Sequence, residues 1–137
     1  MRRGHIVAAS IAMAIAALIT LGVNQFWVNP SFATTAYVRF HYGGKAIDAQ
    51  ITDARDVGAL KDILRGFSLP DEPSCGFDAD IAITLTDGHR GITFCPACDA
   101  CGTYRVGNTN RYIESSDAQR RRFEAIVKKY GMTFPCE

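Results

Sequence analysis

The chain has 137 residues, and its 15 Lys or Arg against 14 Asp or Glu give a formal net charge of only +1 at pH 7. This length predicts a single domain, since domains usually hold about 100–200 residues. A nearly neutral chain offers no electrostatic basis for holding a phosphate backbone, so we expect no nucleic acid among its partners.

The N-terminal segment differs in character from the rest of the chain. Arg2 and Arg3 precede the run Ile6–Val23, which is apolar and carries no charge. This is the layout of a secretory signal or of a signal anchor. A spanning helix needs about 20 apolar residues. We therefore predict a signal anchor, a transmembrane helix over residues 1–28 that contacts the membrane through residues 6–28.

The N-terminal segment also predicts how the protein is oriented in the membrane, and it allows a second interpretation as a cleaved signal peptide. Arginines that stay in the cytoplasm place the N-terminus inside and the domain outside. We therefore expect a single-pass protein of the cell membrane. Alternatively, Ser31 and Ala33 are the small residues that a signal peptidase needs, so the segment is a signal peptide cleaved near residue 33 and the domain is secreted. In both cases residues 29–35 form a linker, and residues 36–137 form the folded domain.

The first half of this domain predicts a hairpin and a helix. Residues 36–42 and 46–51 alternate between apolar and polar side chains, as half-buried strands do. Gly43-Gly44 between them is a tight-turn signal. Apolar residues then recur at helical spacing from Val57 to Phe67. Gly66 marks the end of this predicted helix.

The second half predicts two more hairpins and a second helix. Residues 80–86 alternate, and Asp87-Gly88 is a strong hairpin signal. The returning strand places Ile92 and Phe94 toward the core and Cys95 on the opposite face. Residues 103–106 and 111–114 flank a four-residue turn. The last helix starts at the capping-box pair Ser116 and Gln119.

The element order ββα followed by ββββα predicts an α+β fold. Strands in runs with separate helices indicate an antiparallel sheet built from hairpins. Two amphipathic helices pack on it, and the N-terminal hydrophobic helix precedes both.

Five cysteines are the most specific feature of the domain, and we predict that they act as metal-binding or disulfide residues. They are Cys75, Cys95, Cys98, Cys101 and Cys136. In an oxidising compartment such cysteines are usually paired. A disulfide that closes a loop of tens of residues contributes about 3–4 kcal/mol. Disulfides are therefore the leading interpretation, with one cysteine left over and fifteen arrangements open.

Two other interpretations of the cysteines stay open. Cys95, Cys98 and Cys101, with one remote cysteine, supply four thiolates for a structural zinc site. The sequence Cys95-Pro-Ala-Cys98 also resembles the Cys-Pro-x-Cys motif of thioredoxin-like enzymes, and this resemblance implies thiol–disulfide exchange. In that family the first cysteine opens a helix after a strand, whereas this motif lies among antiparallel strands.

These patterns favour a binding module over an enzyme. The sequence holds no phosphate-binding glycine loop, no Gly-x-Ser-x-Gly and no His-Glu-x-x-His, so no catalytic residue is predicted. We expect a non-enzymatic, cysteine-stapled binding or structural module outside the cytoplasm. An unidentified protein is its expected partner, and it needs no cofactor, with zinc as the alternative.

Overall fold

The computed structural model describes residues 2–70, 80–97 and 102–133. The elements in chain order are α1 (Arg2–Phe26), β1 (Trp27–Val28), β2 (Thr35–Tyr42), β3 (Lys45–Ile51), α2 (Ala54–Ile63), β4 (Gly66–Phe67), β5 (Ile81–Thr86), β6 (Gly91–Pro96), β7 (Thr103–Val106), β8 (Tyr112–Glu114) and α3 (Asp117–Lys129). The predicted α+β class and the order of hairpins and helices are confirmed. The two-residue strands β1 and β4 are additions that the sequence does not predict.

Six strands form one antiparallel sheet in the order β3-β2-β5-β6-β7-β8. The three predicted hairpins, β2–β3, β5–β6 and β7–β8, are all present. Gly43 and Gly44 connect the first hairpin at φ angles of 61° and 77°, which favour glycine over residues with a Cβ. Strands β2 and β5, which are far apart in the sequence, pair as the second and third strands of the sheet.

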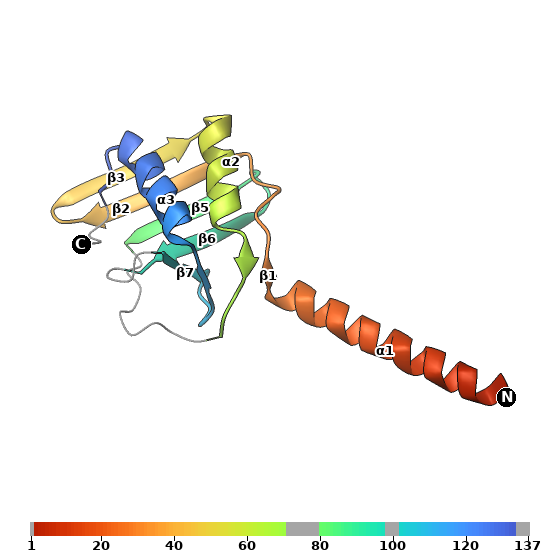
Figure 1. Cartoon of the computed structure of the whole chain (residues 1–137). Helices are drawn as coiled ribbons and strands as arrows, with labels where there is room; N and C mark the ends of the chain where they lie inside the picture. The colour runs from red at the N-terminus through yellow and green to blue at the C-terminus, as the bar shows by residue number, and fades with distance from the viewer. Residues whose placement is uncertain (1, 71–79, 98–101, 134–137) are drawn as a thin grey trace.

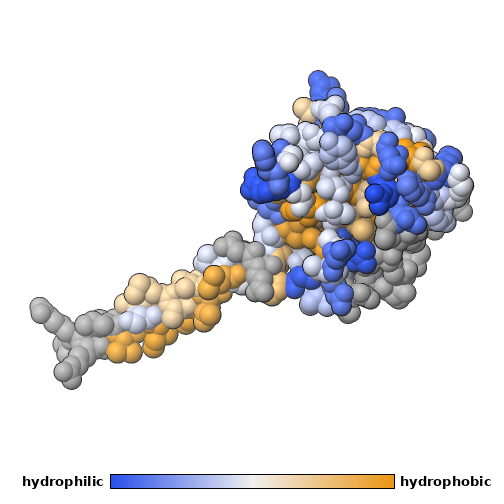
Figure 2. All heavy atoms as spheres, turned by 180° about the vertical axis from the view of Figure 1, so that it is seen from behind, coloured by the Kyte–Doolittle hydropathy of each residue, from blue (hydrophilic) through white to orange (hydrophobic). Residues whose placement is uncertain are grey.

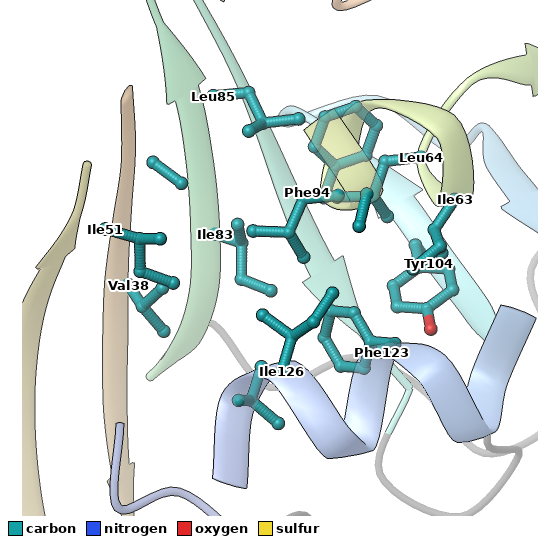
Figure 3. Packing of buried hydrophobic residues seen from close by; sticks show 14 of the residues in the cluster. Val38, Ile51, Ile63, Leu64, Ile83, Leu85, Phe94, Tyr104, Phe123 and Ile126 are labelled. Atoms are coloured by element: carbon teal, nitrogen blue, oxygen red, sulfur yellow. The ribbon is translucent and has the colours of Figure 1, made fainter. Parts of the chain in front are cut away.

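Both α2 and α3 lie on one face of this sheet (Figure 1). The strands turn their apolar residues toward the helices, as their period-2 alternation requires. In β5, Ile81, Ile83 and Leu85 are buried, while Ala82 and Thr84 on the other face are only half-buried. Figure 3 shows this core, in which side chains from the strands meet those from α2 and α3.

Polar caps fix where the two helices begin. The carboxylate of Asp53 accepts hydrogen bonds from the backbone N–H groups of Arg55 and Asp56 at the start of α2. The predicted capping box at α3 is confirmed. The Ser116 hydroxyl accepts from the Gln119 N–H, and the Gln119 side chain accepts from the Ser116 N–H. Each cap satisfies donors that the first helical turn leaves unpaired.

Asp56 joins the start of α2 to the end of α3. Its side chain is buried and accepts hydrogen bonds from Lys129 Nζ at 2.7 Å and from the Tyr130 hydroxyl at 3.0 Å. The hydrogen bond from Lys129 is the main cause that lowers the pKa of Asp56, while burial acts in the opposite direction. The helix dipole favours an anion in the first turn of a helix, where Asp56 lies in α2, and a cation in the last turn, where Lys129 lies in α3.

Helix α1 spans Arg2–Phe26 and projects away from the sheet (Figure 1). Apolar side chains such as Ile11, Leu18 and Leu21 are more than half exposed along it. Across the described part of the chain, no helix combines the length and the apolar character needed to cross a membrane. The predictions of a signal anchor over 1–28 and of a single-pass membrane location are therefore wrong. Cleavage near residue 33 stays a prediction.

The chain between α1 and β2 packs against the domain. Strand β1 pairs with β4, and the Trp27 ring meets the Phe67 ring edge-on with centroids 5.5 Å apart. Ala33, inside the predicted linker 29–35, is buried, and its carbonyl accepts a hydrogen bond from Lys61 Nζ at 3.0 Å. The residues that follow α1 are thus held in place by the domain.

Arg111 is the side chain that fastens this segment most directly. Its guanidinium donates to the hydroxyl and the carbonyl oxygen of Ser68, and it lies 4.1 Å from the centroid of the Phe26 ring. Both the backbone N–H and the hydroxyl of Ser68 donate in turn to the Phe26 carbonyl. One arginine therefore links the strand edge near β8, the segment after β4 and the end of α1.

We expect Arg111→Ala to loosen this contact and to lower the free energy of unfolding by about 1–1.5 kcal/mol, through lost hydrogen bonds and a lost cation–π contact. Trp27, the only tryptophan of the chain, should become more exposed. Its fluorescence maximum should then move to longer wavelength. Arg65→Ala is the control, because the contact that Arg65 makes within the described residues is an exposed ion pair with Asp62. An unchanged Trp27 spectrum in Arg111→Ala would contradict the assigned contact.

Candidate functional site

The sheet face opposite α2 and α3 is the candidate site. No helix of the described part covers it, and Figure 2 looks onto it from behind the view of Figure 1. Hydrophobic patches alternate there with hydrophilic side chains. A sheet with one packed face and one open face turns every second side chain of each strand outward.

Two rows of outward side chains cross this face. In the first, the strand register aligns Gln50, Tyr37, Thr84 and Thr93. In the second, it aligns Asp48, Arg39 and Ala82, and the same register continues to Cys95 and Arg105. The residues of the central strands β5 and β6 are small, whereas those of the outer strands are long. The middle of the face is therefore lower than its two sides.

This difference in side-chain size leaves a hollow of about 650 Å³. Its lining comes from β2, β3, β5, β6 and β7 and from the turn after β7. The lining residues are Tyr37, Val38, Arg39, Asp48, Ala49, Gln50, Ala82, Thr84, Thr93, Cys95, Arg105 and Asn108. The volume lies within the range of roughly 300–1,000 Å³ that is typical of ligand pockets.

Neutral polar groups form the first row of the hollow. The Thr84 and Thr93 hydroxyls are 2.8 Å apart and share one hydrogen bond. Gln50 Nε2 donates to the Tyr37 hydroxyl at 3.2 Å. The Tyr37 ring itself is half exposed. These groups can exchange hydrogen bonds with a ligand while the tyrosine ring offers it an apolar surface.

The β2–β3 side of the hollow contains opposite charges. Arg39 Nε lies 3.9 Å from Asp48 Oδ1, and His41 Nε2 lies 3.2 Å from Asp48 Oδ2. Asp48 and Arg39 are both well exposed, so water weakens their attraction. This side therefore holds a carboxylate together with an arginine and a histidine that lie beside it.

The opposite side of the hollow contains Cys95 and Arg105. Cys95 lies in β6 opposite Arg105 in β7, and Arg105 Nη2 donates to the Cys95 sulfur at 3.7 Å. The prediction that Cys95 points away from the core is confirmed, since its neighbour Phe94 is in the core and Cys95 lines the hollow. Cys95 is only 5% exposed.

The structure corrects the main predictions about the cysteines. The Cys95 thiol is free, and the described residues form no disulfide. Within the same residues, no three His, Cys, Asp or Glu side chains are placed to hold a metal ion. The expected disulfide-stapled domain and the alternative zinc site are therefore wrong for this part of the chain. Cys75, Cys98, Cys101 and Cys136 lie outside the described residues, and their predicted role stays a prediction.

Sequence reasoning missed the hollow, although it assigned most of its residues to outward faces. The available signal was the run of small outward residues in the two central strands: Ala82, Thr84 and Thr93. That signal becomes a hollow only when the strand order places long side chains such as Tyr37 and Arg105 on either side.

Comparison with protein-family models, with curated proteins and with solved structures gives no match to this chain.

Proposed function

We propose that this domain is a non-enzymatic binding module whose open sheet face binds a small molecule in the hollow. The observation that carries the proposal is the hollow itself, with its small central residues and its longer polar rims. Ligand sites are usually concave, with an apolar base and a few placed polar groups. Ala82, the Tyr37 ring and the two threonine hydroxyls fit that description.

Binding is favoured over catalysis by the composition of the lining. Nucleophilic catalysis needs a general base within hydrogen-bond reach of the nucleophile. No histidine is among the residues that line the hollow, and the Cys95 sulfur accepts its hydrogen bond from an arginine. Cys95 also lies within an antiparallel strand. Thiol–disulfide exchange instead favours a cysteine at a helix N-terminus, so this placement does not favour a redox role.

A substitution that fills the hollow tests the proposal. Ala82→Phe adds a ring at its centre, on a strand where aromatic residues are well accepted. We expect that some members of a library of soluble fragments shift the NMR amide signals of Arg39, Thr84 and Thr93 in the full-length protein. We expect Ala82→Phe to weaken their binding by about ten-fold or more, a cost of about 1.4 kcal/mol.

Ala46→Phe is the matched control for this experiment. Ala46 lies on the same outward face, in β3, but it is exposed and does not line the hollow. Fragment affinity should be unchanged in this variant. If no fragment shifts the three amides, or if Ala82→Phe binds as well as the unmodified protein does, the hollow is not a binding site.

A further inference from the structure

The first row of the hollow combines an amide, an aromatic ring and two hydroxyls along one line. The strand register aligns Gln50 on β3, Tyr37 on β2, Thr84 on β5 and Thr93 on β6, and all four line the hollow. Directly opposite residues of antiparallel strands have Cβ atoms about 5 Å apart, so the row spans roughly 15 Å. A ligand that lies along the row therefore meets these groups in succession.

The amide and the hydroxyls of this row both donate and accept hydrogen bonds. The Thr84 and Thr93 hydroxyls share one hydrogen bond at 2.8 Å. Each hydroxyl has one donor and two acceptor sites, so this bond uses only part of the capacity of the pair. Gln50 Nε2 donates to the Tyr37 hydroxyl at 3.2 Å, and an amide also has a second N–H and a carbonyl oxygen. Ligand hydroxyls match such groups, because they too donate and accept.

The Tyr37 ring supplies an apolar surface between these polar groups. The ring is half exposed, and the register places Gln50 on one side of Tyr37 and Thr84 on the other. The faces of an aromatic ring carry partial negative charge. A sugar ring has weakly positive C–H groups on its faces and hydroxyls around its edge. It can therefore lie against the tyrosine ring while its hydroxyls reach the polar groups on either side.

We propose that the hollow binds saccharides, with one sugar ring against Tyr37 and ligand hydroxyls at Gln50 and at the two threonines. This inference rests on the proposed function and names its ligand class. Water hydrates polar groups, and a ligand that displaces this water without replacing its hydrogen bonds loses affinity. A saccharide replaces them, whereas an apolar ligand of the same size does not. In the next row, the exposed Asp48 carboxylate can accept from a further hydroxyl.

Saccharides and a sugar-like ring without ring hydroxyls separate this inference from the broader proposal. The probes are methyl β-D-glucopyranoside, maltose and cellobiose, titrated into the full-length protein and followed through the NMR amide signals of the hollow. Tetrahydropyran-2-methanol is the control ligand, because it keeps the ring and the hydroxymethyl group of glucose but lacks the ring hydroxyls. We expect at least one saccharide to bind about ten-fold or more tightly than this control.

Variants of two tyrosines locate the sugar ring. Tyr37→Leu should reduce saccharide affinity by about ten-fold or more, whereas Tyr37→Phe keeps the ring and should reduce it by no more than about three-fold. Tyr42→Leu is the matched control, because Tyr42 is an exposed tyrosine of the same strand that is not among the residues lining the hollow. It should leave the affinity unchanged. The amide spectrum and melting temperature of each variant establish that it is folded.

Variants of two threonines test the hydroxyl contacts. Thr93→Val removes a hydroxyl and keeps the shape of the side chain, so it should reduce saccharide affinity by about three- to ten-fold. Thr35→Val is the control. Thr35 lies in β2 opposite Thr86 and is not among the residues that line the hollow. Its substitution should change the affinity by less than about two-fold.

Each result has a distinct meaning. If the saccharides bind no more tightly than tetrahydropyran-2-methanol, the hollow is a binding site but does not select hydroxyls. If Tyr42→Leu weakens the saccharides as much as Tyr37→Leu does, or Thr35→Val as much as Thr93→Val, the assigned position is wrong. If no saccharide shifts the signals of the hollow while other fragments do, the ligand class is wrong. If no fragment binds at all, the proposed function fails together with this inference.

Discussion

Phe94→Ala should lower the free energy of unfolding by about 3–5 kcal/mol, the usual cost of removing a buried aromatic ring from a packed core. Phe94 is fully buried in β6, the fourth strand of the six-stranded sheet. Figure 3 shows it in the same cluster as Ile83 and Leu64. Since a domain of this size holds only about 5–15 kcal/mol of stability, the loss should appear as a large fall in the denaturation midpoint followed by circular dichroism.

Thr93→Ala is the control for this prediction. Thr93 is the preceding residue in the same strand, but it points into the hollow and hydrogen-bonds with Thr84. Its truncation should cost no more than about 1.5 kcal/mol, the usual value of one hydrogen bond. Equal losses from the two substitutions would show that β6 does not have one core face and one open face.

Asp56→Asn should lower the free energy of unfolding by about 2 kcal/mol at pH 7. The substituted side chain keeps the size of the original but loses the charge that Lys129 and the Tyr130 hydroxyl bond to, and hydrogen bonds to charged groups contribute about 1.5–3 kcal/mol. The exposed Lys129 side chain places the expected value in the lower half of that range. Urea denaturation at pH 7 measures the difference.

The same pair of proteins should show a pH dependence of defined sign. In the folded protein the pKa of Asp56 lies below its ordinary value of 3.8, chiefly because of the hydrogen bond from Lys129. Its contribution is therefore present above pH 3.8 and is lost as the pH falls through the lower folded value. The stability difference between the two proteins should shrink below about pH 4. The backbone N–H groups of Arg90 and His89 lower the pKa of Asp87 to about 2. Because Asp87 is present in both proteins, its titration does not affect the stability difference between them.

Asp62→Asn in the same helix is the control. Asp62 makes an exposed ion pair with Arg65 at 3.7 Å, and such pairs contribute little. Its substitution should change stability by less than about 0.5 kcal/mol at any pH. If the stability difference between the unmodified protein and Asp56→Asn is the same at pH 7 and below about pH 4, the charge of Asp56 does not stabilise the contact between α2 and α3.

Most of the fold could be predicted because its signals are local. Period-2 alternation, the Gly43-Gly44 turn and the capping box at Ser116 each act within a few residues. Strands β1 and β4 were missed because two residues cannot show a period, and their pairing depends on contacts such as Trp27 with Phe67. Such tertiary contacts leave no pattern in the sequence of either strand.

The candidate site could be predicted only in part, because it depends on strands that are far apart in the chain. The face on which Cys95 lies follows from counting along β6. Its neighbour Arg105 follows only from the β6–β7 pairing, and Tyr37 reaches the same hollow only through the β2–β5 pairing. The expected disulfides rested on the number of cysteines, whereas the position of Cys95 beside an arginine is set by the register of the sheet.

The β2–β5 pairing also has a kinetic consequence. The hairpins β2–β3 and β5–β6 close short turns, so forming each of them costs little chain entropy. Joining them requires Val38 to meet Ile83 across the whole intervening chain, and such non-local contacts slow folding. Until this pairing forms, both hairpins have unpaired edges and the hollow does not exist, because its β2 rim and its β5 floor belong to different halves of the chain.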